Sequence, residues 1–175
     1  IESDGQMTPD ESVNPPVVTN KQEFIDAVKN SGIVGLGGAG FPTAVKLSPK
    51  TQLEYLVING AECEPFITSD HRTMLEDAQN VIDGAAAVMK YLELDECYIG
   101  IEDNKPEAFK VLKEIADKDN NADDAVKLMT LKSRYPQGAE KMMIQSATGR
   151  QLPPGKLPSD IGCMVMNVAS TAFIS

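Results

Sequence analysis

The stretch LEYLVINGAECEPFITSD, residues 53–70, joins a short apolar run to a polar loop. The run is rich in β-branched residues and ends at Gly60, a pattern typical of a buried strand. The loop that follows carries two carboxylates, Glu62 and Glu64, and is stiffened by Pro65. We therefore expect a strand here whose carboxyl end opens onto a polar loop.

Apolar spacing predicts further elements on both sides of this strand. In chain order, the expected elements are a helix over 19–32, a short helix begun by Pro42, the strand 53–60, a helix over 70–92, a strand over 96–102, a helix over 105–118, a strand over 125–133, a helix over 138–149 and a strand within 163–171 that runs into a new helix. Residues 151–162, rich in Pro and Gly, are expected to form a loop or hairpin. Alternating strands and helices require crossover connections, so the predicted fold is α/β, with a largely parallel sheet between helices.

The 175 residues fit one domain. Residues 1–19 are mostly polar and lack apolar periodicity, so we expect a linker or disordered arm before a domain over 20–175. The chain begins with Ile and stops without a polar tail, which suggests a piece of a longer protein.

The charge balance excludes two classes of partner. Lys and Arg number 16 against 26 Asp and Glu, a formal net charge of −10, whereas nucleic acid and anionic membrane surfaces attract basic patches. No apolar run approaches the roughly 20 residues that span a bilayer, so direct membrane insertion is not expected. The three cysteines are widely spaced and form no C-x-x-C pair, so we expect a reducing cytosolic setting and no metal site within the chain.

A second unusual stretch is SGIVGLGGAGFPTAVKLSPK, residues 31–50. Four glycines fall within six positions: Gly35, Gly37, Gly38 and Gly40. They satisfy G-x-G-x-x-G, but a helix rather than a strand precedes them and Pro42 follows at once, so the usual dinucleotide fingerprint is weak. One interpretation is a glycine-rich connector. The other is a ligand cradle, in which Phe41 supplies a stacking surface and Lys46 a cation.

Polar and ring-bearing residues also follow the other predicted strands. The candidates are Asn59, Glu62 and Glu64 in the first segment, Tyr135, Gly138 and Glu140 in the second, and Asn167 and Thr171 in the third. Open parallel sheets bind ligands at the carboxyl ends of their strands, where these segments and the glycine stretch would converge. The alternative for the two glutamates is a solvated acidic turn.

Four motifs in this order resemble the C subunits of Rnf electron-transport complexes and, more distantly, the flavin-bearing NADH-oxidising subunit of respiratory complex I. They are GLGGAGFPTAVKL at 35–47, INGAECEPFITSDHRTMLED at 58–77, YPQGAEKMMI at 135–144 and MNVASTAFI at 166–174. The resemblance covers residues 24–175. It implies a Rossmann-like FMN-binding domain that passes a hydride from NADH to FMN and then single electrons to iron–sulfur clusters.

The resemblance also implies roles for the candidate residues. The four glycines would cradle FMN, with Lys46 helping to hold it, while Asn59 and Glu62 face the isoalloxazine ring. Glu64 would lie nearer the nicotinamide nucleotide and Phe41 would stack on its adenine. The segment of Tyr135, Gly138 and Glu140 would form a second flavin-side wall, and Asn167 with Thr171 would lie near the phosphate or ribityl chain. No side chain need act as a catalytic acid or base.

Cofactors and partners follow from the same resemblance. FMN and NADH would bind this chain, while the 4Fe-4S clusters are expected only in a C-terminal region that the sequence lacks. The partners would be other subunits of a membrane electron-transport complex, with the protein cytoplasmic and peripheral to the inner face of the membrane.

The motifs depart from the complex I pattern at three positions, and the first loop lacks an arginine-glycine that the complex I subunit carries. Ala61 replaces an acid, Cys63 a serine, and Ala139 one of two adjacent glutamates. Two alternatives therefore stay open: a soluble relative, such as a cobalamin reductase or a proline reductase electron-transfer protein, and a non-catalytic docking scaffold with a degenerate pocket.

Overall fold

A computed structural model of the chain describes all residues except 1–4, 7, 9–11, 13 and 119–124. The predicted arm over 1–19 falls partly outside the described residues and stays a prediction. The elements in chain order are α1 (Lys21–Asn30), α2 (Thr43–Lys46), β1 (Tyr55–Gly60), α3 (Ser69–Glu76), α4 (Ala78–Leu92), β2 (Glu96–Glu102), α5 (Pro106–Ala116), β3 (Val126–Leu131), α6 (Glu140–Thr148), the 3-10 helix η1 (Pro158–Ile161), β4 (Cys163–Asn167) and α7 (Val168–Ala172).

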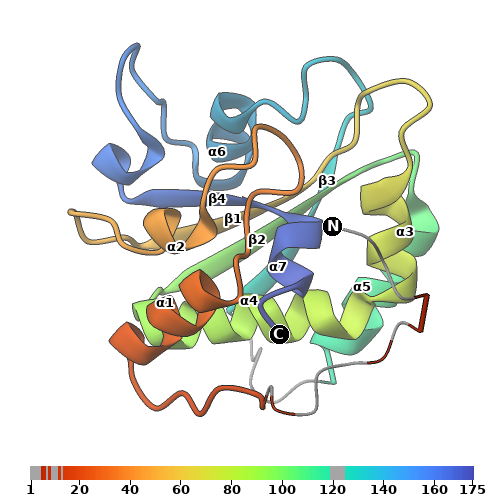
Figure 1. The fold of residues 1–175 in the computed structure, drawn as a ribbon. Helices are drawn as coiled ribbons and strands as arrows, with labels where there is room; N and C mark the ends of the chain where they lie inside the picture. The colour runs from red at the N-terminus through yellow and green to blue at the C-terminus, as the bar shows by residue number, and fades with distance from the viewer. Residues whose placement is uncertain (1–4, 7, 9–11, 13, 119–124) are drawn as a thin grey trace.

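The strands form one four-stranded sheet in the order β3-β2-β1-β4, and every neighbouring pair is parallel. Helix α4 runs along one face of the sheet and α6 covers the other (Figure 1). The predicted α/β fold with a parallel sheet between helices is therefore confirmed. Within the described part of the chain, no helix is both long and apolar enough to cross a bilayer.

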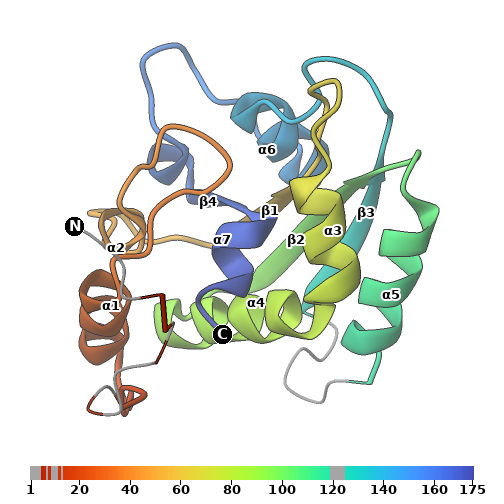
Figure 2. The same cartoon turned by 45° about the vertical axis from the view of Figure 1, so that its right-hand side comes forward.

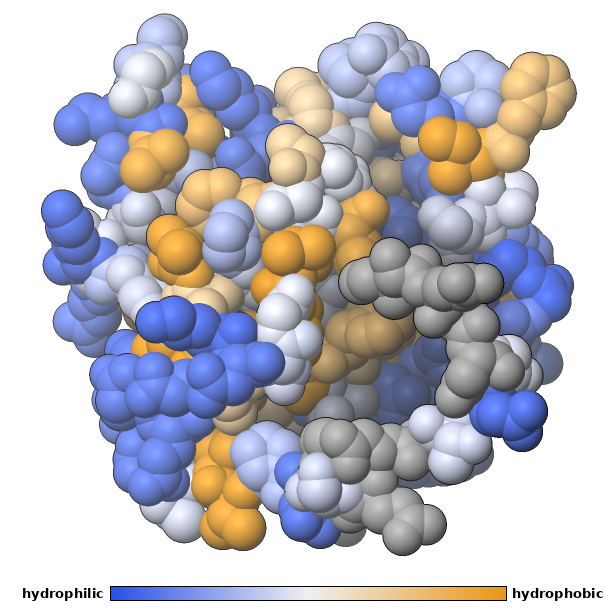
Figure 3. Space-filling view, viewed as in Figure 1, coloured by the Kyte–Doolittle hydropathy of each residue, from blue (hydrophilic) through white to orange (hydrophobic). Residues whose placement is uncertain are grey.

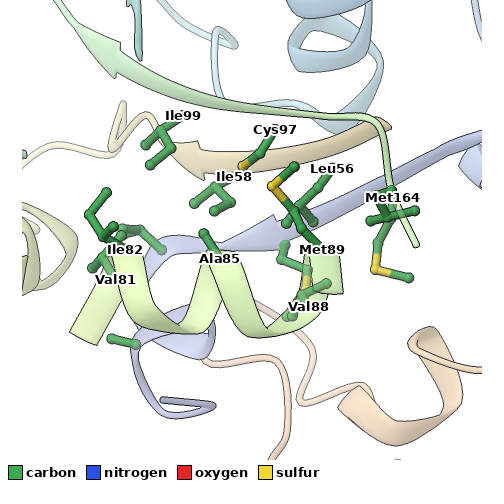
Figure 4. Close-up of a cluster of buried hydrophobic side chains, with 14 of the residues drawn as sticks. Leu56, Ile58, Val81, Ile82, Ala85, Val88, Met89, Cys97, Ile99 and Met164 are labelled. Atoms are coloured by element: carbon green, nitrogen blue, oxygen red, sulfur yellow. The ribbon is translucent and has the colours of Figure 1, made fainter. Parts of the chain in front are cut away.

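Apolar side chains on both faces of the sheet hold the layers together. Figure 4 shows one side of α4 packed against the sheet, with side chains from α4, β1, β2 and β4 in contact: Leu56, Ile58, Val81, Ile82, Ala85, Val88, Met89, Cys97, Ile99 and Met164. On the other face, Val57 and Val165 pack with Met143 and Ile144 of α6. Because successive residues of a strand point to opposite faces, a strand buried on both sides reads as a continuous apolar run.

The predicted single helix over 70–92 is wrong, because the chain forms two helices that meet at Asp77. The backbone there has φ −117° and ψ 26°, outside the helical region. Figure 2 shows α3 standing upright while α4 lies along the sheet. Aspartate competes with the helix by favouring caps and turns, and the break lets α3 pack mainly against α5 and α7 while α4 lies along the sheet.

Helix α7 lies close against α4, and Gly84 makes this approach possible. A Cβ at Gly84 would overlap the carbonyl oxygen of Thr171 and lie 2.9 Å from its carbonyl carbon. The close packing fixes the position of α7, and with it the carboxyl end of β4, from which α7 starts.

Candidate functional site

The direction in which successive strands are added to the sheet reverses between β1 and β4. Strands β2 and β3 are added on one side of β1, whereas β4 pairs with its other side. Open α/β sheets form their ligand crevice at such a switch point, beyond the carboxyl ends of the two strands. Asn59 and Asn167 lie at these strand ends and pair in register. The sheet therefore brings together two of the predicted site residues.

The Asn59 amide joins β1 to the segment that precedes α6. Its Nδ2 donates a hydrogen bond of 2.8 Å to the carbonyl oxygen of Gly138, and its Oδ1 accepts one of 3.0 Å from the backbone N–H of Ala61. A Cβ at Gly138 would lie 3.0 Å from the carbonyl oxygen of Ala61, so a bare backbone allows the two segments to approach. Their contact makes one wall of the crevice.

The Asn167 side chain joins three parts of the site. Its Oδ1 caps α7 by accepting hydrogen bonds from the backbone N–H groups of Ala169 and Ser170, at 2.9 and 3.3 Å. Its Nδ2 donates to Asp70 Oδ2 at 2.7 Å. A Cβ at Gly37 would overlap this Nδ2, so the glycine loop lies directly against the asparagine.

The glycine loop, residues 34–42, is a narrow excursion closed at its base. Val34 and Pro42 form an isolated antiparallel bridge, and the Gly35 N–H donates to the Phe41 carbonyl at 2.8 Å. The loop is also tied to α7, because the Leu36 N–H donates to Ser170 Oγ at 2.8 Å. Its base and one flank are therefore held by hydrogen bonds.

The glycines of this loop serve different purposes. Gly37 has no room for a side chain, whereas a Cβ at Gly38 or Gly40 would meet no heavy atom within 4 Å. Gly40 has φ +66°, a left-handed conformation that glycine adopts without strain. Gly38 has neither constraint, so nothing within the described protein accounts for its missing side chain.

The Glu62 carboxylate caps helix α3. It accepts hydrogen bonds from the backbone N–H groups of Asp70 and His71, at 2.8 and 3.3 Å, and from the Ser69 hydroxyl at 3.3 Å. The backbone N–H of Glu62 donates to Glu102 Oε2 at 3.1 Å. Both carboxylate oxygens of Glu62 therefore hold the strand-end loop against α3. The predicted position of Glu62 at the flavin ring did not include this structural role.

Charged groups lie at both ends of the crevice. Burial raises the pKa of the Asp70 carboxyl, opposed by the Asn167 hydrogen bond and reinforced by the nearby negative charge of Glu62. Lys46 Nζ donates to the Val165 carbonyl at 2.7 Å and lies 4.0 Å from Glu140 Oε1. The crevice thus has an acidic end near α3 and a cation near α2.

Three neighbouring hollows lie around the carboxyl ends of β1 and β4 and along β4. An inner cavity of about 460 Å³ lies between the strand-end loop, the segment before α6 and Asn167. A loop cavity of about 190 Å³ lies under the glycine loop and shares Gly37, Asn59 and Asn167 with it. An outer groove of about 460 Å³ continues past Phe41 and Lys46 toward η1.

Most of the predicted site residues line these hollows: Gly35, Gly37, Gly38, Phe41, Lys46, Asn59, Glu62, Glu64, Tyr135, Gly138, Glu140 and Asn167. Gly40 lines none of them and acts through its backbone conformation. Thr171 is not brought to a cavity: it is fully buried, and its hydroxyl donates to the Asn167 carbonyl at 2.9 Å. The cofactor contacts of all these residues stay predictions.

Sequence reasoning missed several residues that hold the site in shape. Asp70 lines the inner cavity, and Ser170 anchors the glycine loop. Glu102 and Lys105 form a buried ion pair of 2.6 Å behind the strand-end loop. Glu102 ends β2, so its place at a strand's carboxyl end was the one available signal.

The residues present fit the FMN that the motifs imply. A flat ring with a phosphate tail needs bare backbone, polar groups for its edge and a cation, and the open face of Gly38, the Asn59 amide and Lys46 supply these along connected hollows. Apolar side chains are exposed beside them: Leu36, Phe41, Ile67 and Tyr135. Figure 3 shows apolar atoms protruding at the tip of the loop between β1 and α3.

Comparison with known proteins agrees with this geometry. The C subunit of the proton-translocating ferredoxin:NAD(+) oxidoreductase complex of Clostridium ljungdahlii is 42% identical over 156 residues, covering 88% of this chain and 33% of the relative. The C subunit of the Na(+)-translocating ferredoxin:NAD(+) oxidoreductase complex of Acetobacterium woodii is 44% identical over 181 residues, covering 100% and 40%. The chain thus spans between a third and two fifths of these relatives.

A solved structure shares the fold. The NAD+-reducing [NiFe]-hydrogenase in its air-oxidized state superposes with a TM-score of 0.72 at 20% identity, over 89% of this chain and 30% of the hydrogenase chain. A family model described as the Nuo51 FMN-binding domain matches residues 28–175. The resemblance seen in the four motifs is confirmed, and the chain belongs to the Nuo51 FMN-binding domain family.

Proposed function

We propose that this chain is the FMN- and NADH-binding domain of a C-type subunit in an ion-translocating electron-transport complex. The observation that carries the proposal is Gly38, whose open face lies in the loop cavity and is explained by no neighbour in the described protein. Family membership and the names of the relatives support the same function. The other subunits of the complex and a peripheral place at the membrane belong to this proposal.

The chain's own residues would bind and orient the two cofactors. The glycine loop would offer its backbone to the flavin, and the Lys46 ammonium would attract the FMN phosphate. Hydrogen bonds of Asn59 and Asn167 hold the residues that line the cavities in place. Bound FMN would supply hydride acceptance from NADH and one-electron transfer onward. Clusters that receive these electrons would lie outside residues 1–175.

The outer groove is the proposed site for the adenosine half of NADH. Phe41 and Leu157 are both exposed on its lining, at 50% and 66%, and offer apolar surface to a purine. The groove meets the loop cavity at Phe41 and Lys46, so a dinucleotide lying in it would reach toward the flavin.

One observation favours the scaffold alternative. Ala61 and Ala139 both line the inner cavity, where the complex I pattern has carboxylates. A folded chain that binds no FMN would support this second function. Binding of FMN without reduction by NADH would mean that the pocket keeps the flavin but not the nucleotide.

The test is anaerobic reduction of the FMN-loaded chain. NADH should bleach the visible flavin absorbance, and Phe41→Ala should raise the NADH concentration needed for half-maximal rate while FMN stays bound. A matched control is Val45→Ala, another exposed apolar residue of the outer groove, which should have a smaller effect. Failure of NADH to reduce bound FMN would contradict the proposed enzyme.

A further inference from the structure

Asp70 contacts two separate parts of the site at once. It lies in the first turn of α3, where its backbone N–H donates to Glu62 Oε1 at 2.8 Å. Its carboxylate accepts the Nδ2 hydrogen bond of Asn167 at 2.7 Å and lines the inner cavity. The residue therefore links the strand-end loop of β1 to the end of β4.

This contact fixes which way the Asn167 amide faces. Oδ1 must face the N–H groups of Ala169 and Ser170, and Nδ2 must face an acceptor. A flipped amide would place its oxygen against the Asp70 carboxylate and its NH₂ against two N–H donors. The α7 amides and the Asp70 carboxylate together exclude the flipped orientation, which would set donor against donor at α7 and acceptor against acceptor at Asp70.

The Asn167 amide is in turn the surface on which Gly37 rests. The Gly37 backbone lies so close to Nδ2 that no Cβ would fit between them. The neighbouring Leu36 N–H donates to the hydroxyl of Ser170 in α7, the helix that Asn167 caps. A displaced Asn167 would therefore remove the support under Gly37 and loosen the cap of α7, the helix whose Ser170 holds Leu36.

We propose that Asp70 is a positioning residue, which holds Asn167 so that the glycine loop keeps its cofactor-binding shape before the cofactor arrives. The inference rests on the proposed function, in that FMN is the cofactor whose binding the loop prepares. Burial and the charge of Glu62 oppose ionisation here, with Lys105 favouring it, so the position gains from a hydrogen-bond acceptor more than from a charge.

Two variants separate the acceptor from the charge. Asp70→Ala removes both, whereas Asp70→Asn keeps an oxygen that can accept from Asn167. Asp70→Ser also removes the acceptor, because the serine side chain is one atom shorter than that of aspartate and its hydroxyl stops short of Asn167. The control is Asp77→Ala, an exposed acid between α3 and α4 whose side chain makes no capping hydrogen bond.

The first readout is backbone amide hydrogen exchange in the absence of flavin. Asp70→Ala and Asp70→Ser should speed exchange of the Leu36 and Ser170 amides by about tenfold or more, since the Nδ2 donor of Asn167 is left without its acceptor. Asp70→Asn and Asp77→Ala should leave these rates within about twofold of the unmodified chain. Unchanged exchange in both removal variants would overturn the proposal, as would equal acceleration in Asp70→Asn.

The second readout is the FMN dissociation constant. It should rise about tenfold or more in the two removal variants and return close to the original value in Asp70→Asn. Faster exchange without weaker FMN binding would overturn the positioning role and leave a purely structural contact. If the unmodified folded chain binds no FMN, the proposed function fails, while the exchange comparison still decides whether Asp70 holds the loop.

Discussion

Gly37→Ala places one methyl group where the structure has no space for it. The new Cβ would overlap Asn167 Nδ2 and lie 2.6 Å from its Cγ and 2.9 Å from its Cβ. The asparagine cannot simply turn aside, because Oδ1 is bonded to the amides of α7 and Nδ2 to Asp70. Relief of the overlap must therefore break some of these bonds or move the glycine loop.

The cost follows from the bonds at risk. Loss of the α7 cap costs about 1 kcal/mol, and loss of a hydrogen bond to a carboxylate about 1.5–3 kcal/mol. Alanine restricts the unfolded chain more than glycine does, and this effect offsets about 0.4–1 kcal/mol of the loss. If both bonds are lost, we expect the free energy of unfolding to fall by about 1.5–3.5 kcal/mol. If the loop moves instead, the Leu36–Ser170 hydrogen bond is lost and the flavin site changes shape.

Urea denaturation followed by circular dichroism measures this difference, with Gly38→Ala as the matched control. A Cβ at Gly38 enters open space and the backbone there has no left-handed φ, so the control should raise the free energy of unfolding by about 0.4–1 kcal/mol or leave it unchanged. Equal stability of Gly37→Ala and Gly38→Ala, with unaltered FMN binding in the former, would refute the packing argument.

Substitutions at three further residues test other contacts. Gly84→Ala should lower the free energy of unfolding by about 1–2 kcal/mol in the same assay, because overlap with Thr171 outweighs the gain in helix propensity. Glu62→Ala should lower it by about 1–2 kcal/mol, since the first-turn amides of α3 lose their acceptor, and Glu62→Gln should lose less. Hydrogen bonds from Ser133 hold the pKa of Asp103 at about 2, below its usual 3.8, so this carboxylate stabilises the fold above about pH 4 and loses that effect as the pH falls toward 2. The melting temperature of the original chain should therefore exceed that of Asp103→Asn at neutral pH, and a gap that did not close over this range would contradict the assignment.

The sequence predicted the fold through local patterns. Apolar runs and helical spacing located every strand of the sheet, and alternation implied their parallel arrangement. Strand-end logic brought Asn59 and Asn167 to one edge, because that logic needs only the direction of each strand. The break at Asp77 was missed, since apolar periodicity continues across it and only packing on the sheet separates the two helices.

The roles of individual site residues depended on neighbours that the sequence does not reveal. Thr171 has the polarity of a ligand contact, but α7 turns it into the protein against α4. Gly37 belongs to the predicted cradle, yet its missing side chain serves the contact with Asn167. The sequence places Asp70 only within a helix, because the partner of its carboxylate is far along the chain.

The central claim, that the glycine loop is a flavin cradle, is tested most directly by FMN titration of the purified chain and of Gly38→Val. Quenching of flavin fluorescence reports binding, and matched melting temperatures establish that both chains are folded. We expect saturable binding by the unmodified chain and binding at least about tenfold weaker by the valine variant, whose side chain would enter the loop cavity. Equally tight binding by both chains, or no binding by the folded unmodified chain, would contradict the account.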